Sequence, residues 1–206
     1  MINNVIFDIG GVILDWDLEY MLDMCKNEEE KEFVKENIFY TPEWANGGLL
    51  DTGSITQYDF IANVQERTNH VNDKFVSDFI LGYYKTFHVK EEVLSLIDKL
   101  REKGIKVYIL SNINDYICDK IDANKFLDKV DGYVLSYQVH EIKPNKKIYE
   151  ILIDKYKLDP SKSLFIDDVM DNIKSANELG IKGRQVIKNS YDDILNILNE
   201  YKVLGE

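Results

Sequence analysis

The sequence is poor in the residues that mark small secreted scaffolds and multidomain chains, with only two cysteines and three prolines in 206 residues. Cys25 and Cys118 are too few for a disulfide scaffold, and they lie in no Cys-x-x-Cys pair. The chain shows no repeats, low-complexity tracts or Pro/Gly-rich linkers. Its length suits one ordinary domain with a modest insertion and is too short for two full-sized domains.

Positive charge is also in deficit, because 25 Lys and Arg residues face 37 Asp and Glu residues for a net charge of -12. A protein this negative repels a phosphate backbone, so neither nucleic acid nor an anionic membrane is expected as a partner. No apolar run approaches the roughly 18 to 20 residues of a transmembrane helix, and Asp8 interrupts the first apolar run, unlike in a signal peptide. We therefore expect a soluble, cytoplasmic protein.

What the chain does contain is a globular composition, with 45% hydrophobic and 30% charged residues. Short apolar runs that stop at small polar residues predict buried strands over 4–7, 106–110, 132–135, 163–166 and, more weakly, 185–187. Between them, helical spacing of apolar residues predicts helices over 91–103, 144–157 and 171–179 and a last helix opening at Ser190. This alternation predicts an α/β fold, a Rossmann-like parallel sheet with helices on both faces.

Residues 16–89 interrupt the alternation with helical patterns alone. The predicted helices span 18–25, 28–39, 54–67 (with Ser54-x-x-Gln57 as a capping box) and 72–87. A block of about 70 residues without strands is too long for an ordinary strand-to-helix connection. We therefore predict a small helical cap domain at 16–89, inserted into a core made of 1–15 and 90–206.

Polar residues follow the predicted strands at the edge where open parallel sheets bind ligands. They are Asp8, Ser111, Lys143 a short loop beyond the third strand, and the pair Asp167-Asp168. Each has a structural alternative: Asp8 as the start of a turn, Ser111 as a helix cap, and the Asp pair as compensation of a helix dipole. Taken one by one, these alternatives are favoured; taken together, the four positions converge on one crevice.

Lys143 is harder to explain structurally, because it directly precedes Pro144 at a predicted helix start. Cations are disfavoured at that end of a helix by about 0.3–1 kcal/mol each at exposed sites. A bound anion beside the helix N-terminus would account for Lys143, which makes it a candidate phosphate ligand. Lys146 and Lys147, in the first predicted turn, are interpreted as solvated surface residues.

The polar motifs occur in a characteristic order: Asp8, then Ser111-Asn112, then Lys143-Pro144, then Asp167-Asp168-x-x-x-Asn172. This order resembles the haloacid dehalogenase-like hydrolase superfamily, and the helical block after the first motif is similar to that superfamily's helical cap. The resemblance spans essentially the whole chain. The segments FDIGGVILDWD, ILSN, KPNKKIYEIL and FIDDVMDNIKSANELGI look closest to glucose 1-phosphate phosphatases and to the N-terminal phosphatase domain of soluble epoxide hydrolase.

The resemblance implies a phosphatase in which Asp8 attacks phosphorus and forms an aspartyl-phosphate. The chemistry suits the residue type, because a carboxylate is ionised near neutral pH and needs no base. Three carboxylates facing a phosphate dianion require a cation, and oxygen ligands select Mg²⁺. By the family pattern, the metal ligands are Asp8, Asp168 and the backbone carbonyl of Gly10.

The same resemblance assigns the remaining motif residues to the phosphoryl group and to support. Lys143 neutralises phosphate charge, while the Ser111 side chain and the Asn112 backbone N–H hold phosphoryl oxygens. Asp167 and Asn172 support the metal ligands from behind. All these roles are what the resemblance implies for the matching positions.

One position departs from the family pattern. Most phosphatases of the superfamily carry a second Asp two residues after the nucleophile, as general acid and base, and here that residue is Gly10. The backbone carbonyl is kept, but the proton donor to the leaving group is lost. Asp15 is one candidate substitute, and its alternative interpretation as a solvated loop acid is favoured.

Four aromatic residues of the predicted cap offer a surface for a sugar: Tyr40, Trp44, Tyr83 and Tyr84. Aromatic residues in a small helical bundle more often form its core, and that interpretation is preferred. The stretch 44–48 (Trp-Ala-Asn-Gly-Gly) predicts a loop that faces the substrate.

The motifs together predict a Mg²⁺-dependent phosphomonoester hydrolase acting on a small phosphorylated metabolite, a sugar phosphate such as glucose 1-phosphate. One rival is a haloacid dehalogenase, which needs no metal; the Asp167-Asp168 pair argues against it, because extra acids would repel its carboxylate product. The other rival is a non-catalytic phosphate-ligand-binding protein, suggested by Gly10. We expect a monomer or a weak homodimer.

Overall fold

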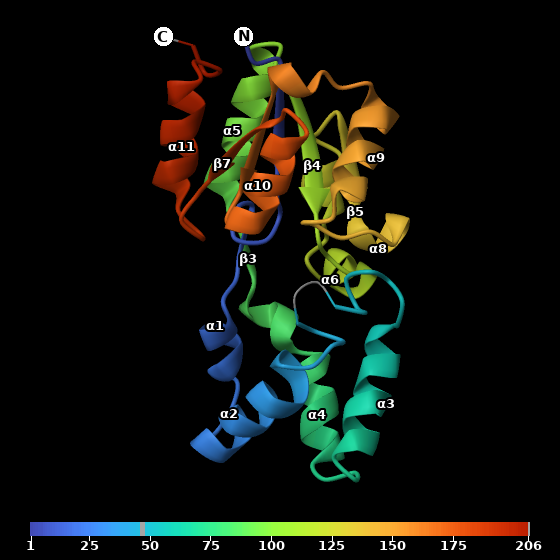
Figure 1. Ribbon diagram of the computed structural model, residues 1–206. Helices are drawn as coiled ribbons and strands as arrows, with labels where there is room; N and C mark the ends of the chain where they lie inside the picture. The colour runs from blue at the N-terminus through green and yellow to red at the C-terminus, as the bar shows by residue number, and fades with distance from the viewer. Residues whose placement is uncertain (46–47, 206) are drawn as a thin grey trace.

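The computed structural model describes residues 1–45 and 48–205 and contains a five-stranded parallel sheet (Figure 1). The strand order is β5-β4-β1-β6-β7, so the first strand lies in the centre. The strands are β1 (Asn4–Phe7), β4 (Lys106–Ser111), β5 (Gly132–Leu135), β6 (Ser163–Asp167) and β7 (Lys182–Gln185). The predicted α/β fold is confirmed. The fifth strand lies at 182–185, however, and the prediction of a strand at 185–187 is wrong.

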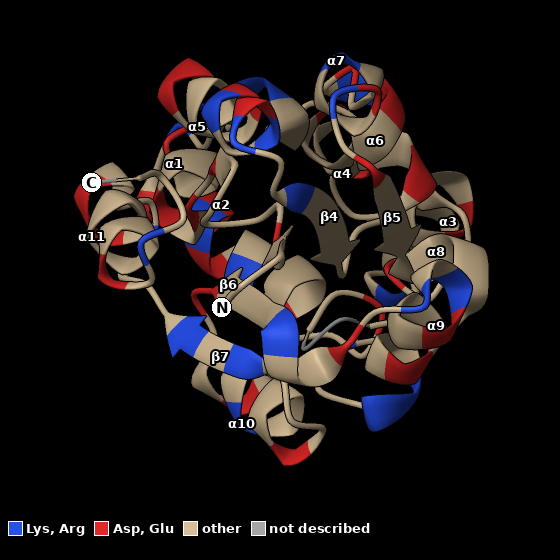
Figure 2. Ribbon diagram, turned by 90° about the horizontal axis from the view of Figure 1, so that it is seen from above, with Lys and Arg blue, Asp and Glu red and all other residues tan. Residues whose placement is uncertain are grey.

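Side chains of alternate residues in the strands build two apolar layers, one on each face of the sheet. Ile6, Tyr108 and Phe165 pack with α9 (Lys146–Tyr156) and α10 (Met170–Glu178). Their neighbours, such as Val5 and Val107, pack on the opposite face with α5 (Glu91–Glu102) and α11 (Tyr191–Glu200). Figure 2 shows these two helix pairs on opposite sides of the sheet. Strands buried on both faces explain why they read as continuous apolar runs.

Helix α9 begins later than its sequence pattern indicates. Its first residue is Lys146 and its cap is Asn145, whose side chain accepts a hydrogen bond from the Lys147 N–H. The prediction that Pro144 opens this helix is therefore wrong. The start of α11 is as predicted, because the Ser190 side chain accepts from the Asp193 N–H. The short core elements are α6 (Asp115–Lys120), α7 (Asn124–Leu127), α8 (Ser136–Val139) and η3 (Pro160–Lys162).

Helices make up most of the described part of the predicted cap, which forms the lower half of the molecule in Figure 1, but a short strand at 88–89 corrects the expectation of a block without strands. The helices are α1 (Leu18–Leu22), α2 (Glu28–Val34), η1 (Lys35–Phe39), α3 (Gln57–Arg67), α4 (Asp73–Ile80) and η2 (Tyr83–Thr86). Two short antiparallel strands, β2 (Leu14–Asp15) and β3 (His88–Val89), join this part to the sheet. The exact division at 15/16 and 89/90 stays a prediction.

The capping box of α3 is shifted from the predicted position. Thr56 is the cap, its side chain accepts from the Asp59 N–H, and the Asp59 carboxylate accepts from the Thr56 N–H. The expected pair of Ser54 and Gln57 is therefore wrong: Gln57 is buried and its amide donates to the carbonyl of Ile80 in α4.

Both chain termini lie at the end of the core that faces away from the helical half (Figure 1). Within 1–45 and 48–205, no helix combines the length and the apolar character needed to cross a bilayer. The loops after the carboxyl ends of β1, β4 and β6 face the helical half, so that any ligand bound there lies between the two parts of the molecule.

Candidate active site

The strand ends bring Asp8 and the Asp167-Asp168 pair to one edge of the sheet. Phe7 of β1 pairs with Ile166 of β6, and the Asp8 N–H continues the ladder by donating to the Ile166 carbonyl at 3.0 Å. Asp8 is 7% exposed and Asp167 is fully buried. The parallel register therefore aligns the two acidic motifs, although about 160 residues separate them in the sequence.

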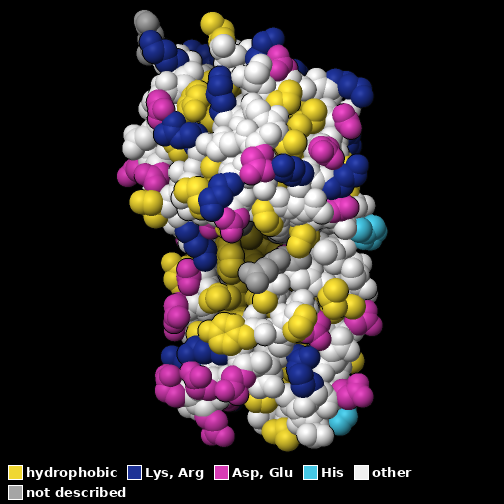
Figure 3. Space-filling view, viewed as in Figure 1, with side chains coloured by type: hydrophobic (Ala, Val, Ile, Leu, Met, Phe, Trp, Pro, Cys, Tyr) yellow, Lys and Arg dark blue, Asp and Glu magenta, His cyan; other side chains and the backbone are white. Residues whose placement is uncertain are grey.

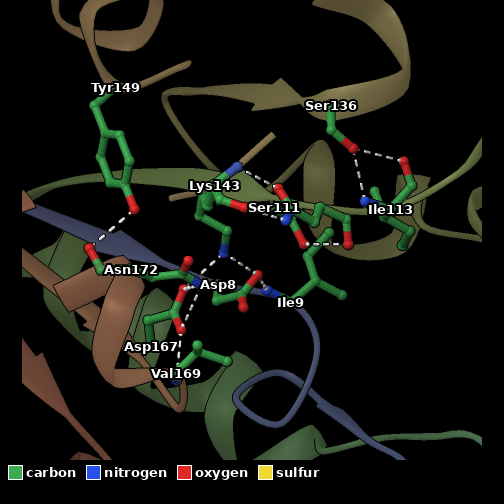
Figure 4. A network of polar contacts seen from close by, with 11 residues as sticks. Asp8, Ile9, Ser111, Ile113, Ser136, Lys143, Tyr149, Asp167, Val169 and Asn172 are labelled. Carbon is green, nitrogen blue, oxygen red and sulfur yellow. Dashed lines mark hydrogen bonds and ion pairs between the residues drawn. The ribbon is translucent and has the colours of Figure 1, made fainter. Parts of the chain in front are cut away.

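Lys143 joins these carboxylates from the other side of the crevice. Its Nζ lies 2.9 Å from Asp8 Oδ1 and 2.7 Å from Asp167 Oδ2, and the side chain is almost fully buried (Figure 4). Two carboxylates compensate a charge that burial alone would make very unfavourable. Asp167 and Asp8 consequently raise the pKa of Lys143 above its ordinary value, although burial acts in the opposite direction.

The backbone of Lys143 is fixed by Asn112, which follows β4. The Asn112 side-chain amide donates to the Lys143 carbonyl at 2.9 Å, and its oxygen accepts from the Lys143 N–H at 2.8 Å. Lys143 thus precedes Asn145, the N-cap residue of α9, and its side chain points at Asp8. It is not a cation at the N-terminus of a helix, as the sequence pattern suggested. The sequence pattern assigned Asn112 a backbone contact to phosphate; the structure adds this side-chain role.

Asp167 is held rigidly by the start of α10. Its Oδ1 accepts from the Val169 N–H at 2.7 Å, and both oxygens lie 3.0 Å from the Asn172 amide nitrogen. The Asn172 carbonyl in turn accepts from the Tyr149 hydroxyl at 2.9 Å (Figure 4). This network fixes the orientation of Asp167 and hence one end of the Lys143 ion pair, while the predicted support of the metal ligands by Asp167 and Asn172 stays a prediction.

The three carboxylates are close enough to share one cation. One oxygen each from Asp8, Asp167 and Asp168 lies within 4.8 Å of the others. Burial raises the pKa of Asp8 to about 7, Asp167 and Asp168 add to that rise, and Lys143 opposes it. Burial and Asp167 also raise the pKa of Asp168. A cluster with three acids and one lysine has excess negative charge and hard oxygen donors, which fits Mg²⁺.

Gly10 and Gly11 shape the turn between Asp8 and β2. Gly11 has φ +70°, and a Cβ atom there would lie 2.5 Å from Asp168 Oδ2, so only glycine suits this position. At Gly10 a Cβ atom would lie 3.0 Å from the indole Nε1 of Trp16. The indole N–H of Trp16 therefore lies in tight contact with the position where the side chain of the family's second Asp would begin.

A cavity of about 910 Å³ opens from Asp8 and Lys143 toward the helical half. Figure 3 shows it as a hollow between the two halves of the molecule, lined largely by hydrophobic side chains. Its volume falls within the range of small-molecule sites. Asn112 and Asp168 also line it, whereas Ser111 is fully buried at the end of β4 and is not part of the described lining.

Three of the four predicted cap aromatics line this cavity: Tyr40, Trp44 and Tyr83. Trp44 also packs against Tyr83, with ring centroids 4.8 Å apart, so it belongs to the aromatic core and to the cavity wall at once. Tyr84 instead packs edge-on against Tyr116 and does not contribute to the described lining. Of the predicted loop 44–48, residues 46 and 47 lie outside the described residues.

Asp15, the candidate substitute for the missing acid, lies elsewhere. It belongs to β2 and lines a separate, smaller depression with Tyr20, Asp23 and His88. The structure instead adds four polar side chains to the main cavity that sequence patterns did not single out: Trp16, Asp51, Asn114 and Asp171. They come from different segments, so no local spacing signals them.

Comparison with known proteins agrees with this geometry. Residues 2–180 match the family model described as haloacid dehalogenase-like hydrolase. The chain belongs to this family. The predicted resemblance and the prediction that the chain is a hydrolase are thereby confirmed.

Among curated relatives, this hydrolase is 26% identical to the D-ribitol-5-phosphate phosphatase of Bacteroides thetaiotaomicron, over 88% of this chain and 90% of the relative. Two others match only in part. The (S)-2-haloacid dehalogenase 4A of Burkholderia cepacia is 28% identical over 55% of this chain and 50% of its own length. The bifunctional epoxide hydrolase 2 of Mus musculus is 30% identical over 45% of this chain and 18% of the relative.

A solved structure extends the comparison to the cofactor. A HAD family enzyme of Bacteroides thetaiotaomicron, in complex with magnesium and inorganic phosphate, superimposes with a TM-score of 0.76. The two sequences are 26% identical, and the match covers 95% of this chain and 99% of that one. The carboxylate cluster of the hydrolase offers oxygen ligands of the kind that magnesium prefers. The predicted magnesium cofactor is therefore supported by this cluster and by the related structure.

Proposed function

We propose that this hydrolase is a magnesium-dependent phosphomonoesterase that uses Asp8 as nucleophile on a small phosphorylated metabolite. The observation that carries the proposal is the buried Lys143 ammonium, 2.9 Å from Asp8 at the inner end of the cavity. A fixed positive charge beside a carboxylate nucleophile suits a substrate whose reacting group is an anion. The full-length relative that acts on a phosphate ester supports the same reaction class.

In this mechanism an Asp8 carboxylate oxygen attacks phosphorus, the bond from phosphorus to the ester oxygen breaks, and an aspartyl-phosphate forms. Lys143 stabilises the charge on the phosphoryl oxygens, while Asn112 and Asp167 hold its position. The departing oxygen takes a proton from water, because residue 10 offers none. Water then attacks phosphorus, releasing phosphate and restoring Asp8.

Magnesium would be held by Asp8, Asp168 and the Gly10 carbonyl, and when bound it supplies positive charge that draws phosphate to an acidic site. The supporting observation is the excess of three carboxylates over one lysine. The Ser111 side chain and the Asn112 N–H remain our candidates for phosphoryl oxygens, with Asn112 the one that lines the cavity.

Two alternatives of the sequence interpretation are less well supported. A dehalogenase acts on a carboxylate, which Asp167 and Asp168 would repel without a metal. A non-catalytic phosphate-binding protein would have no need of a lysine held against a carboxylate by a dedicated asparagine. Hydrolysis of a phosphate ester by the native protein would distinguish our proposal from both of these alternatives.

The substrate we propose is a sugar or polyol phosphate. A cavity with aromatic walls and a few polar groups suits a hydroxylated carbon chain. The relative named as a ribitol-5-phosphate phosphatase makes a polyol phosphate as reasonable as the glucose 1-phosphate expected from sequence. A cytoplasmic location and a monomeric or weakly dimeric state stay predictions.

The deciding experiment is hydrolysis of p-nitrophenyl phosphate with and without Mg²⁺ by the native protein and by Asp8→Asn. The exchange keeps the size of the side chain but removes the nucleophilic charge, so activity should fall by at least about 10³-fold. Asp15→Asn is the matched control, because it removes an acid outside the cavity and should leave activity within twofold. More than a few per cent of activity in Asp8→Asn would remove Asp8 from this role.

A further inference from the structure

The proposed mechanism leaves two carboxylates of the cavity lining unused: Asp171, which is exposed and pairs with Lys174, and Asp51. Asp51 lies between η1 and α3 and lines the same cavity as Asp8, whereas the acids of the catalytic cluster come from the sheet edge. Three contacts anchor its turn to the core. Asn114 Nδ2 donates to Asp51 Oδ1 at 3.2 Å, the Ser136 hydroxyl donates to the Asp51 carbonyl at 2.6 Å, and His140 Nδ1 lies 2.8 Å from the Thr52 carbonyl.

The partners of Asp51 are themselves fixed. Asn114 caps α6, and its Oδ1 accepts from the Ile117 N–H at 3.0 Å, so its amino group is left to point at Asp51. The Ser136 hydroxyl also accepts from the Ile113 N–H at 2.9 Å (Figure 4). Asp51 is therefore held in place by the rigid core, although it belongs to the predicted cap. A preorganised acceptor of this kind recognises a ligand at little entropic cost.

The charge around Asp51 leaves it available to a ligand. Burial raises its pKa to about 6, and Asn114 and Lys143 oppose the rise, so the group is mostly ionised at neutral pH. The other titratable neighbours are Tyr83 and Cys118, whose pKa values are raised by burial and which are neutral at that pH. Among the described residues only Oδ1 of the carboxylate has a hydrogen-bond partner. An ionised oxygen facing a cavity requires donors from whatever fills it.

The charges of Lys143 and Asp51 indicate which kind of ligand the cavity binds. The phosphoryl end belongs at Lys143, because a second carboxylate at Asp51 repels anions. The other end must bring neutral donors to Asp51 and apolar surface to Trp44, Leu50 and Tyr83, which line the cavity nearby. Hydroxyl groups on a carbon chain satisfy both demands, and a leaving group with its own carboxylate or second phosphate does not.

We propose that Asp51 is a specificity residue whose carboxylate accepts hydrogen bonds from the hydroxyl groups of a polyol or sugar phosphate bound with its phosphoryl group at Asp8. The proposal rests on the proposed phosphatase function and deepens it. Asp51 acts on binding of the leaving group and takes no part in bond breaking.

The test compares native protein with Asp51→Asn on three esters: ribitol 5-phosphate, n-butyl phosphate and p-nitrophenyl phosphate. The first two leave as primary alkoxides but only the first carries hydroxyl groups, and the third reports on the catalytic centre alone. Loss of a hydrogen bond to a charged group should raise KM for ribitol 5-phosphate about 10- to 100-fold. kcat/KM for the other two esters should stay within about twofold. Glu66→Gln, an exposed acid of α3, controls for the loss of one charge.

Other patterns overturn the proposal. An equal loss on all three esters would make Asp51 a mere anchor of its turn. A kcat loss shared by ribitol 5-phosphate and n-butyl phosphate, with p-nitrophenyl phosphate spared, would make it a proton donor instead. Asparagine is isosteric and removes a partly buried charge, so the variant should keep its fold, which its melting temperature verifies.

A calorimetric experiment keeps this proposal separate from the phosphatase proposal. Ribitol 5-phosphate is titrated into Asp8→Asn with and without Asp51→Asn, so that no turnover is required. Weaker binding by about 10-fold or more in the double variant supports a role of Asp51 in recognition, and equal binding refutes it. Failure of the native protein to hydrolyse any ester would refute the proposed function alone.

Discussion

Replacing Lys143 by methionine tests whether its ammonium compensates the buried carboxylates of Asp8 and Asp167 and thereby stabilises the fold. Methionine matches the length of the lysine stem but leaves Asp8 and Asp167 facing each other without a cation. Removing one partner of a buried ion pair typically costs about 3–5 kcal/mol. Because two buried carboxylates lose the same partner, at 2.9 and 2.7 Å, we expect a loss in this range.

The loss should depend on pH. The pKa of Asp8 is raised from 3.8 to about 7 in the folded protein, so ionising it opposes folding as the pH rises through this interval. Lys143 lowers that pKa, and its removal raises it further. The difference in unfolding free energy between native protein and variant should therefore be larger at pH 7.5 than near pH 4, because the Asp8 part is absent where Asp8 is protonated in both proteins and grows as the pH rises above about 7.

The assay is urea unfolding in EDTA at both pH values, with two matched variants. Lys146→Met removes an exposed lysine whose partner, Glu178, is also exposed, and should change stability by less than about 0.5 kcal/mol. Lys143→Met combined with Asp167→Asn removes one of the stranded charges and should recover much of the loss. If Lys143→Met unfolds at the native urea midpoint at pH 7.5, the ion pair does not have the energetic role assigned to it here.

Three further predictions concern the metal side and the turn. Asp168→Asn should raise the Mg²⁺ concentration for half-maximal activity at least about 10-fold, measured by metal titration; an unchanged value would exclude Asp168 as a ligand. Gly11→Ala should lower both stability and Mg²⁺ affinity, because its φ is positive and its Cβ would meet Asp168, and a melting curve like the native one would contradict this. Gly10→Asp should favour esters with basic leaving groups, by up to about 10²-fold in kcat, once Trp16 shifts by a few tenths of an ångström. The same gain on aryl phosphates would show that the new carboxylate is not donating a proton.

Local features of the sequence determined the sheet, most helices and the motif residues of the site. Strands buried on both faces need continuous apolar runs, and the residues that end them lie at one edge whatever the details of packing. The same local logic predicted the Ser190 cap correctly. It failed at α3, because Ser54 and Thr56 are both suitable N-cap residues. Gln57 cannot complete a capping box with Ser54, since its amide donates to the carbonyl of Ile80, 23 residues away.

Only the tertiary structure decided which groups these residues meet. The sequence made Lys143 a candidate phosphate ligand, but its ion pairs with Asp8 and Asp167 and the Asn112 contacts that orient it join segments far apart in the chain. Asp51 is held at the cavity wall by a hydrogen bond from Asn114, which lies 63 residues away in the sequence. Periodicity and spacing report the local environment of a residue. The position of a carboxylate across a cavity depends instead on how the helical half packs against the sheet edge, and no local pattern encodes that packing.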